Sequence, residues 1–105
     1  MPQFDVYRNA DAASRATYPF LLDVQSDLLS DLSTRAVVPL CLASTLKGKL
    51  LGTLTPILEV ERKSYALLTP QLAGISAKQL GAKIADMRGR RQEIIAALDF
   101  LITGI

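Results

Sequence analysis

The sequence predicts a mainly β domain that ends in a single α-helix. Two patterns within the 105 residues carry this prediction. In several short segments apolar and polar residues alternate, as they do in strands that place one face against a core. Near the end of the chain the apolar residues change to helical spacing. Strands followed by one terminal helix indicate a sheet or a small barrel with the helix packed against it.

Five segments have the pattern of strands. They are residues 3–8, 20–26, 35–43, 55–61 and 64–69. In the first, Phe4 and Val6 fall on one face, which indicates a half-buried strand. The third contains Pro39, whose missing N–H predicts a bulge or an edge at that point. The last two are expected to form a hairpin through Arg62 and Lys63.

The terminal helix is predicted to run from near Met87 to near Ile102. One broad apolar face would be formed by Met87, Ile94, Ile95, Leu98, Leu101 and Ile102. Asp86 stands where an N-cap is expected, and Gly104 where a helix commonly ends. The segment 46–53 gives a weaker pattern, for which we expect a loop with one helical turn.

Composition limits the class of protein. The length of 105 residues fits one domain, 1–105, and a hydrophobic fraction of 50% argues against disorder. A net charge of +2 does not favour a nucleic-acid-binding surface. No signal peptide and no apolar run of about 20 residues is present, so we expect a cytoplasmic protein without membrane contact. Cys41 lies in an apolar run, which predicts a buried thiol.

The residues that commonly carry catalysis are scarce. The chain contains no histidine, one cysteine and no glycine-rich phosphate-binding motif, so we expect no catalytic residues, no metal and no cofactor. Asp23 and Asp27 are the best candidates for a carboxylate pair. Their spacing predicts two solvated carboxylates in a turn, with Ser26 or Asp27 capping it.

Two other features suggest contact with a partner. Arg88, Arg90 and Arg91 fall in the first turns of the predicted helix, where the helix dipole disfavours cations. They form either a solvated face or a landing site for an acidic segment. The chain also ends on an apolar residue, Ile105. That side chain packs into the core, lies in a dimer interface, or is presented to a partner.

Several of these segments resemble the CcdB family of toxins. The matching residues are Gln3-Phe4-x-Val6-Tyr7, Leu22-Asp23-Val24-Gln25-Ser26-Asp27-Leu28-Leu29, Arg35-x-Val37-Val38-Pro39-Leu40 and Gly104-Ile105. The resemblance implies an SH3-like barrel of the CcdB/Kid/MazF type with a C-terminal helix, forming a two-fold homodimer. It implies a toxin of a toxin–antitoxin system that binds the A subunit of DNA gyrase and traps the cleaved gyrase–DNA complex. A CcdA-like antitoxin would neutralise the toxin and regulate transcription with it.

The resemblance also implies which residues meet the partners. The gyrase-binding residues would be Leu28, Leu29, Asp99, Ile102, Thr103, Gly104 and Ile105. The charge pattern, and not the resemblance, suggests Arg88, Arg90 and Arg91 as the residues that steer the acidic tail of the antitoxin. Better-known members carry tryptophan at the position of Thr103, and threonine cannot make its cation–π contact. Two alternatives stay open: an endoribonuclease on the same barrel, as in the related Kid and MazF toxins, and a degenerate toxin that binds only its antitoxin.

Overall fold

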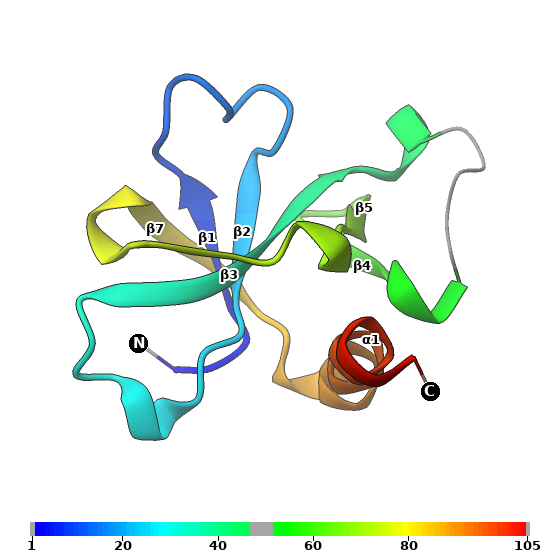
Figure 1. Cartoon of the computed structure of the whole chain (residues 1–105). Helices are drawn as coiled ribbons and strands as arrows, with labels where there is room; N and C mark the ends of the chain where they lie inside the picture. The colour runs from blue at the N-terminus through cyan, green and yellow to red at the C-terminus, as the bar shows by residue number, and fades with distance from the viewer. Residues whose placement is uncertain (1, 47–51, 105) are drawn as a thin grey trace.

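The computed structural model describes residues 2–46 and 52–104. It contains a curled antiparallel sheet, with one helix packed beside it (Figure 1). The strands are β1 (Asp5–Asn9), β2 (Phe20–Asp23), β3 (Thr34–Leu42), β4 (Ile57–Val60), β5 (Lys63–Leu67), β6 (Ala73–Ser76) and β7 (Leu80–Asp86). The helix is α1 (Arg91–Thr103). The 3-10 turns within these described residues are η1 (Asp27–Leu29), η2 (Ala43–Leu46), η3 (Gly52–Leu54), η4 (Thr69–Gln71), η5 (Ala77–Gln79) and η6 (Arg88–Arg90).

The sheet is organised around β3. Its strand order is β4-β5-β3-β2-β1-β7, and β6 pairs with β3 outside this path. One edge of β3 pairs with β2, in a register that ends at Asp23↔Val37. The other edge pairs with β6 near the start of β3 and with β5 near its end. The mainly β architecture with one terminal helix is therefore confirmed.

Pro39 lies where the partner of β3 changes. The β5 register ends at Leu40, the β6 register begins at Val37, and Pro39 falls between them. Its carbonyl accepts a hydrogen bond from the Leu68 N–H at 2.9 Å. The ring nitrogen points to the same side of the strand and therefore faces the gap between the β5 and β6 pairings. The expected loss of a ladder bond at Pro39 is met by a local edge between two partners and not by a bulge, and this gap accommodates the missing N–H.

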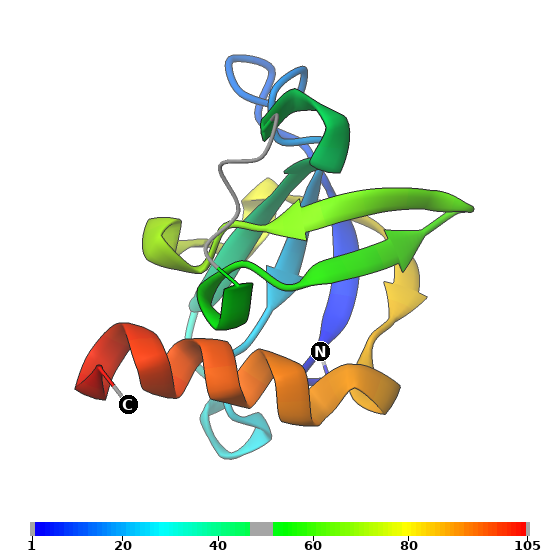
Figure 2. The same ribbon diagram turned by 90° about the vertical axis from the view of Figure 1, so that its right-hand side faces the viewer.

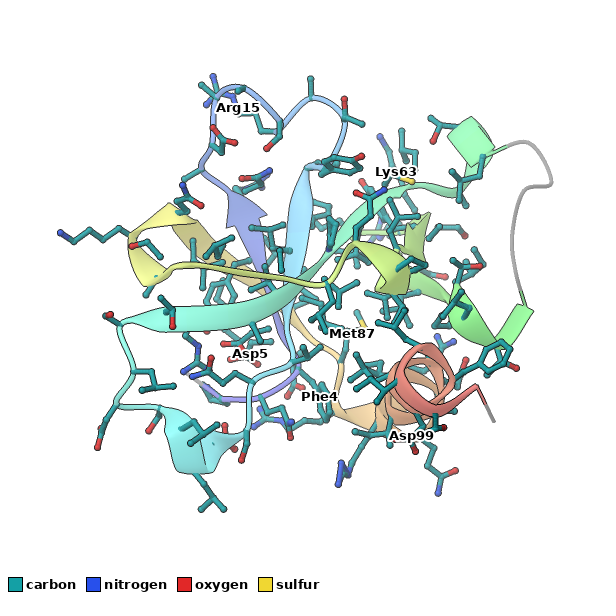
Figure 3. All side chains as sticks on the ribbon, in the orientation of Figure 1. Phe4, Asp5, Arg15, Lys63, Met87 and Asp99 are labelled. Carbon is teal, nitrogen blue, oxygen red and sulfur yellow. The ribbon has the colours of Figure 1, made fainter. Side chains whose placement is uncertain are left out.

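One face of the sheet carries the main core. Alternating residues on five strands turn inward and meet Ile94 of α1. The buried set is Phe4, Val6, Phe20, Leu22, Val24, Val38, Leu40, Leu58, Val60, Tyr65, Leu67, Met87 and Ile94. In Figure 3, Phe4 and Met87 lie between the sheet and the helix. The helix thus covers the apolar face that the alternation predicts.

The opposite face is buried as well. Asp5 and Tyr7 are 0% and 6% exposed, so β1 is not half-buried as its pattern indicates. The chain from β6 to β7 passes in front of the sheet and connects the edge of β3 to the edge of β1 (Figure 1). This crossing covers the second face. The sequence pattern did not predict β6 or β7, and so it could not predict that cover.

Two turns differ in detail from expectation. The β4–β5 hairpin turns at Glu61 and Arg62, one residue earlier than predicted, and both residues have positive φ values of 51° and 68°. Two such residues match the hand of a two-residue hairpin. Most of the predicted loop 46–53 lies outside the described residues, although Leu46 and residues 52–53 belong to η2 and η3. Cys41 is 4% exposed, which confirms the buried thiol.

The helix begins four residues later than predicted, after the turn η6. Asp86 Oδ1 accepts a hydrogen bond from the N–H of Arg88, the first residue of η6, at 2.8 Å, and the residue that precedes α1 is Arg90, so Asp86 is not the N-cap of the helix. Gly104 ends the helix as predicted, with φ 75° and its N–H bonded to the Phe100 carbonyl. Ile102 was expected on the packed face but is 75% exposed.

None of the helices in residues 2–46 and 52–104 combines the length and hydropathy needed to cross a membrane.

Candidate protein-binding surface

The loop between β2 and β3 presents apolar side chains to solvent. Leu28 is 94% exposed, and Leu29 and Leu32 are 51% and 53% exposed. In Figure 1 this loop, which contains η1, projects below the sheet. Nearby exposed apolar side chains are typical of a surface that binds another protein. Sequence reasoning identified Leu28 and Leu29 and missed Leu32.

Polar contacts, not apolar packing, hold this loop. No residue of η1 is buried. Ser26 Oγ accepts from the Leu28 N–H at 3.2 Å, which confirms Ser26 as the cap of the turn. Asp27 Oδ1 accepts from the Gln3 N–H at 2.7 Å, so the N-terminal segment ties down the start of η1. Gln3 Nε2 also donates to the Val24 carbonyl at 3.0 Å.

Gln25 joins the loop to the sheet. Its Oε1 accepts from the Ala36 N–H of β3 at 3.0 Å, and its Nε2 donates to the Leu29 carbonyl at 2.7 Å. Its own N–H donates to Asp23 Oδ1 at 3.0 Å. The side chain is 7% exposed. The end of η1 is therefore fixed to β3 through a buried carboxamide.

Asp23 and Arg35 form a buried ion pair beneath this loop. Arg35 Nη2 and Nε lie 2.6 Å and 2.9 Å from Asp23 Oδ2, and the side chains of Arg35 and Asp23 are 1% and 0% exposed. Burial raises the pKa of Asp23, while its bonds to Gln25 and Arg35 oppose the rise. The prediction that Asp23 is a solvated turn carboxylate was wrong. A charged residue in each of two apolar strands was the available signal for this pair.

The exposed end of α1 forms the second part of the predicted surface. Ile102, Thr103 and Gly104 are exposed, as is Asp99 one turn earlier. The Thr103 hydroxyl donates to the Asp99 carbonyl at 2.7 Å, so it is already bonded within the helix. Ile105 lies outside the described residues, and the structure does not test its predicted role.

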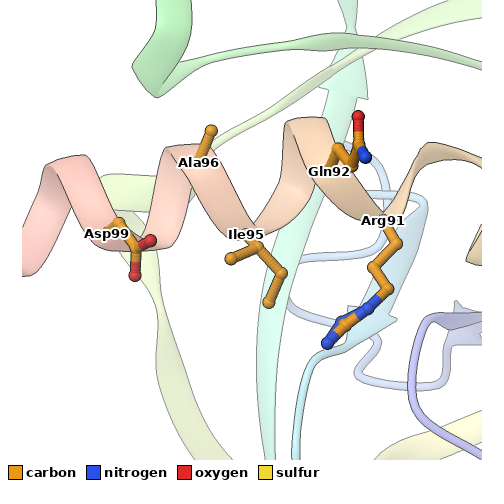
Figure 4. A pocket seen from close by; sticks show the side chains of 5 residues that line it. All are labelled: Arg91, Gln92, Ile95, Ala96 and Asp99. Atoms are coloured by element: carbon orange, nitrogen blue, oxygen red, sulfur yellow. The ribbon is translucent and has the colours of Figure 1, made fainter.

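A groove runs along α1 towards this end. It has a volume of about 330 Å³ and is lined by Arg91, Gln92, Ile95, Ala96 and Asp99. Figure 4 shows Arg91, Ile95 and Asp99 projecting from one side of the helix. The groove therefore has a cation at one end, an anion at the other and an apolar residue between them.

A single chain does not bring the two parts of the surface together. Figure 1 shows η1 and the C-terminal end of α1 at separate places on the molecule. Neither part alone gathers all the predicted gyrase-binding residues. Contact with both parts requires a partner that spans them or a second copy of the chain.

The three arginines near the start of α1 differ in their surroundings. Arg88 Nη2 lies 2.6 Å from Asp86 Oδ2, and Arg90 Nη2 lies 2.7 Å from Glu93 Oε2. These contacts lower the pKa values of Asp86 and Glu93 and raise those of Arg88 and Arg90. The two carboxylates offset the unfavourable helix dipole.

Arg90 and Arg91 also contact residues outside the helix, on the strand side of the molecule. Arg90 Nη2 donates to the Ile57 carbonyl at 2.9 Å. The Arg91 guanidinium lies 5.8 Å from the centre of the Phe4 ring, within cation–π range. Arg91 has no carboxylate within salt-bridge distance among residues 2–46 and 52–104. Of the three arginines, it is therefore the best placed to meet an acidic partner.

Asp5 is a buried carboxylate that sequence reasoning did not single out. Lys83 Nζ lies 3.4 Å and Arg88 Nη2 lies 3.9 Å from its oxygens, and Asp5 itself is 0% exposed. Burial, with Asp5 nearby, raises the pKa of Tyr7. Across the part of the chain that the structure describes, no three His, Cys, Asp or Glu residues cluster as metal ligands would.

The curled antiparallel sheet and the C-terminal helix of the described residues are consistent with the barrel that the sequence resemblance implies. The model of one toxin family, described as CcdB protein, matches residues 3–104. The chain belongs to the CcdB family and is thus a toxin of a toxin–antitoxin module.

Proposed function

We propose that this toxin acts by binding the A subunit of DNA gyrase and trapping the cleaved gyrase–DNA complex, without a catalytic step of its own. The proposal rests on family membership over residues 3–104, together with the 94% exposure of Leu28. A toxin that works by binding needs an apolar contact residue and needs no general acid or general base. Leu28 provides an apolar anchor on a loop that is held by hydrogen bonds to Ser26, Asp27 and Gln25.

The energetics favour a central role for the loop. Removing apolar surface from water contributes roughly 25 cal/mol per Å², so a fully exposed leucine gains the most on contact. Order in the free loop lowers the entropic cost of binding. Apolar anchors near the centre of an interface typically cost about 2 kcal/mol or more when truncated. Leu28, at 94% exposure, has the most apolar surface to gain from contact, and Leu29, at 51%, has less.

The helix end would supply the rest of the contact. Ile102 is 75% exposed and stands beside Thr103. Because the Thr103 hydroxyl is bonded to Asp99, this residue offers a partner mainly its methyl group. The apolar contact must then come more from Leu28, Leu29 and Ile105 than in members that carry tryptophan at position 103.

A CcdA-like antitoxin with an acidic and apolar tail is proposed as the neutralising partner. The groove on α1 has the matching chemistry, with Arg91 at one end and Ile95 beside it. A disordered tail can follow such a groove and become ordered on binding. Arg88 and Arg90 would contribute less than Arg91, because their guanidinium groups already contact Asp86 and Glu93.

Calorimetry of the Leu28→Ser variant against a gyrase A fragment tests the proposal. We expect affinity to fall at least about tenfold, since an anchor is lost. The melting temperature should stay near that of the unchanged protein, because Leu28 is 94% exposed. Leu42→Ser is the matched control: Leu42 is 37% exposed but lies on β3, away from η1.

Equal affinity of the Leu28→Ser variant and the unchanged protein would contradict this role of the loop. Cleavage of RNA by the purified protein alone would instead support the endoribonuclease alternative. If the unchanged protein binds the antitoxin but does not bind gyrase, it is a degenerate toxin.

A further inference from the structure

We propose that Gln25 is the positioning residue that holds Leu28 and Leu29 in place for the partner. This inference rests on the proposed function, because it concerns the same loop. Gln25 contacts no partner in the proposal. It acts through the main chain of η1, to which its side chain is bonded.

The loop depends on such a bond. Residues 26–33 follow the last β2–β3 pair, Asp23↔Val37, and all but the intermediate Ser26 are exposed. Apolar packing therefore contributes little to their conformation. The Gln25 side chain is 7% exposed and spans from the Ala36 N–H to the Leu29 carbonyl. It thus fixes residue 29 relative to β3.

The bridge requires a donor and an acceptor at once. A carboxamide supplies both: its Nε2 donates to the Leu29 carbonyl, and its Oε1 accepts from the Ala36 N–H. Alanine at this position supplies neither. An ionised glutamate supplies only acceptors, and its charge would face the Leu29 carbonyl. A protonated glutamate restores one donor and one acceptor.

The charges around position 25 reinforce this pH dependence. Asp23 accepts from the Gln25 N–H, Arg35 is paired with Asp23, and Asp27 carries a carboxylate two residues along the chain. The nearby carboxylates disfavour a further negative charge and Arg35 favours it, but Arg35 is already paired with Asp23. A Gln25→Glu variant should therefore reproduce the bridge only when the pH is low enough to protonate it.

Asn9 provides a matched control. Its side chain is also 7% exposed, and its Nδ2 donates to Ser14 Oγ and to the Tyr18 carbonyl, both at 2.9 Å. It thereby holds a different loop, residues 10–19, through the same chemistry. Replacement of Asn9 removes a buried carboxamide without touching η1.

The experiment compares Gln25→Ala, Gln25→Glu and Asn9→Ala with the unchanged protein. Calorimetry against the gyrase A fragment measures binding at about pH 7.5 and about pH 5, and amide hydrogen exchange measures order in residues 27–32. We expect Gln25→Ala to lose at least about tenfold in affinity and to exchange faster in this segment. Gln25→Glu should bind weakly at the higher pH and regain affinity at the lower pH, relative to the unchanged protein. Asn9→Ala should keep its affinity.

Two results would overturn the proposal. One is unchanged affinity and unchanged exchange in Gln25→Ala. The other is an equal loss of affinity in Asn9→Ala, which would indicate a general loss of stability. If the unchanged protein does not bind gyrase, the proposed function fails. The exchange of residues 27–32 then still decides whether Gln25 orders the loop.

Discussion

At the scale of single residues, the buried pair of Asp23 and Arg35 is the feature with the clearest physical consequence. Both charges are removed from water, and each relies on the other at 2.6 Å. Breaking a buried pair by removing one partner typically costs about 3–5 kcal/mol, because the remaining charge is left uncompensated. The pair therefore makes the base of the η1 loop sensitive to substitution.

The raised pKa of Asp23 gives a prediction about pH. Because burial raises its folded pKa above the ordinary value of 3.8, the folded chain holds this proton more tightly than the unfolded chain. The contribution of Asp23 to the free energy of unfolding should therefore decrease as pH rises from 3.8 through the raised folded value. Urea unfolding of the unchanged protein and of the Asp23→Asn variant at several pH values measures this contribution.

The Asp23→Asn variant is the reference for this measurement. Asparagine has the shape of the protonated carboxyl group and does not titrate, so the difference in the free energy of unfolding between the two proteins isolates the titration of Asp23. The lowered pKa values of Asp86 and Glu93 make the free energy of unfolding increase with pH. Both residues are present in both proteins, so their contributions cancel in the difference. A stability difference that stays constant with pH, or grows as pH rises, would contradict a raised pKa.

At the scale of elements, the end of α1 is separable from the sheet. Thr103 and Gly104 are exposed, and their hydrogen bonds return to the helix itself, at Asp99 and Phe100. The last turn of a helix can fray without disturbing what the rest of the helix covers. Binding and folding should therefore be separable here.

Deletion of residues 103–105 tests this separation. We expect the gyrase A fragment to bind at least about 30-fold more weakly, corresponding to an anchor of about 2 kcal/mol. Antitoxin binding should be kept, and the melting temperature should fall by only a few degrees, about 4–8 °C per kcal/mol. Calorimetry and a thermal melt of the same sample give both values. A collapsed melting temperature would show that the deleted residues belong to the core.

The elements also show what the sequence can and cannot predict. β1 to β5 and α1 were predicted, because alternation and helical spacing report the apolar face that each element buries. β6 and β7 were missed because they are built largely from small residues, such as Ala73, Gly74, Gly81 and Ala82, which give no strand pattern. Leu28 was identified through the family resemblance. The bridging role of Gln25 depends on contacts across the β2–β3 loop, which no local pattern reports.

At the scale of the whole molecule, the exposed apolar residues and the separation of the two surface parts favour a homodimer. A short chain that is 50% hydrophobic and leaves Leu32, Leu72 and Phe100 at least 37% exposed has apolar surface to cover beyond the residues assigned to gyrase. An isologous two-fold contact is the commonest arrangement. It would also present each part of the surface twice to a single partner.

Sedimentation at micromolar concentration should therefore show a species with twice the mass of one chain. The Leu28→Ser variant should sediment in the same way, because the proposal assigns Leu28 to gyrase and not to the second copy. A species of one chain mass for the unchanged protein would exclude the homodimer. A dimer that dissociates on Leu28→Ser would move this residue from the gyrase-binding surface to the dimer interface.

The closure of the β2–β3 hairpin has a consequence for how such a toxin can evolve. The ladder ends at Asp23↔Val37, and the bridge beyond it ends on a main-chain oxygen, the carbonyl of residue 29. A main-chain oxygen is present whatever side chain stands there. Side chains 28, 29 and 32 can therefore be exchanged under selection for a different target while the framework that displays them is inherited unchanged.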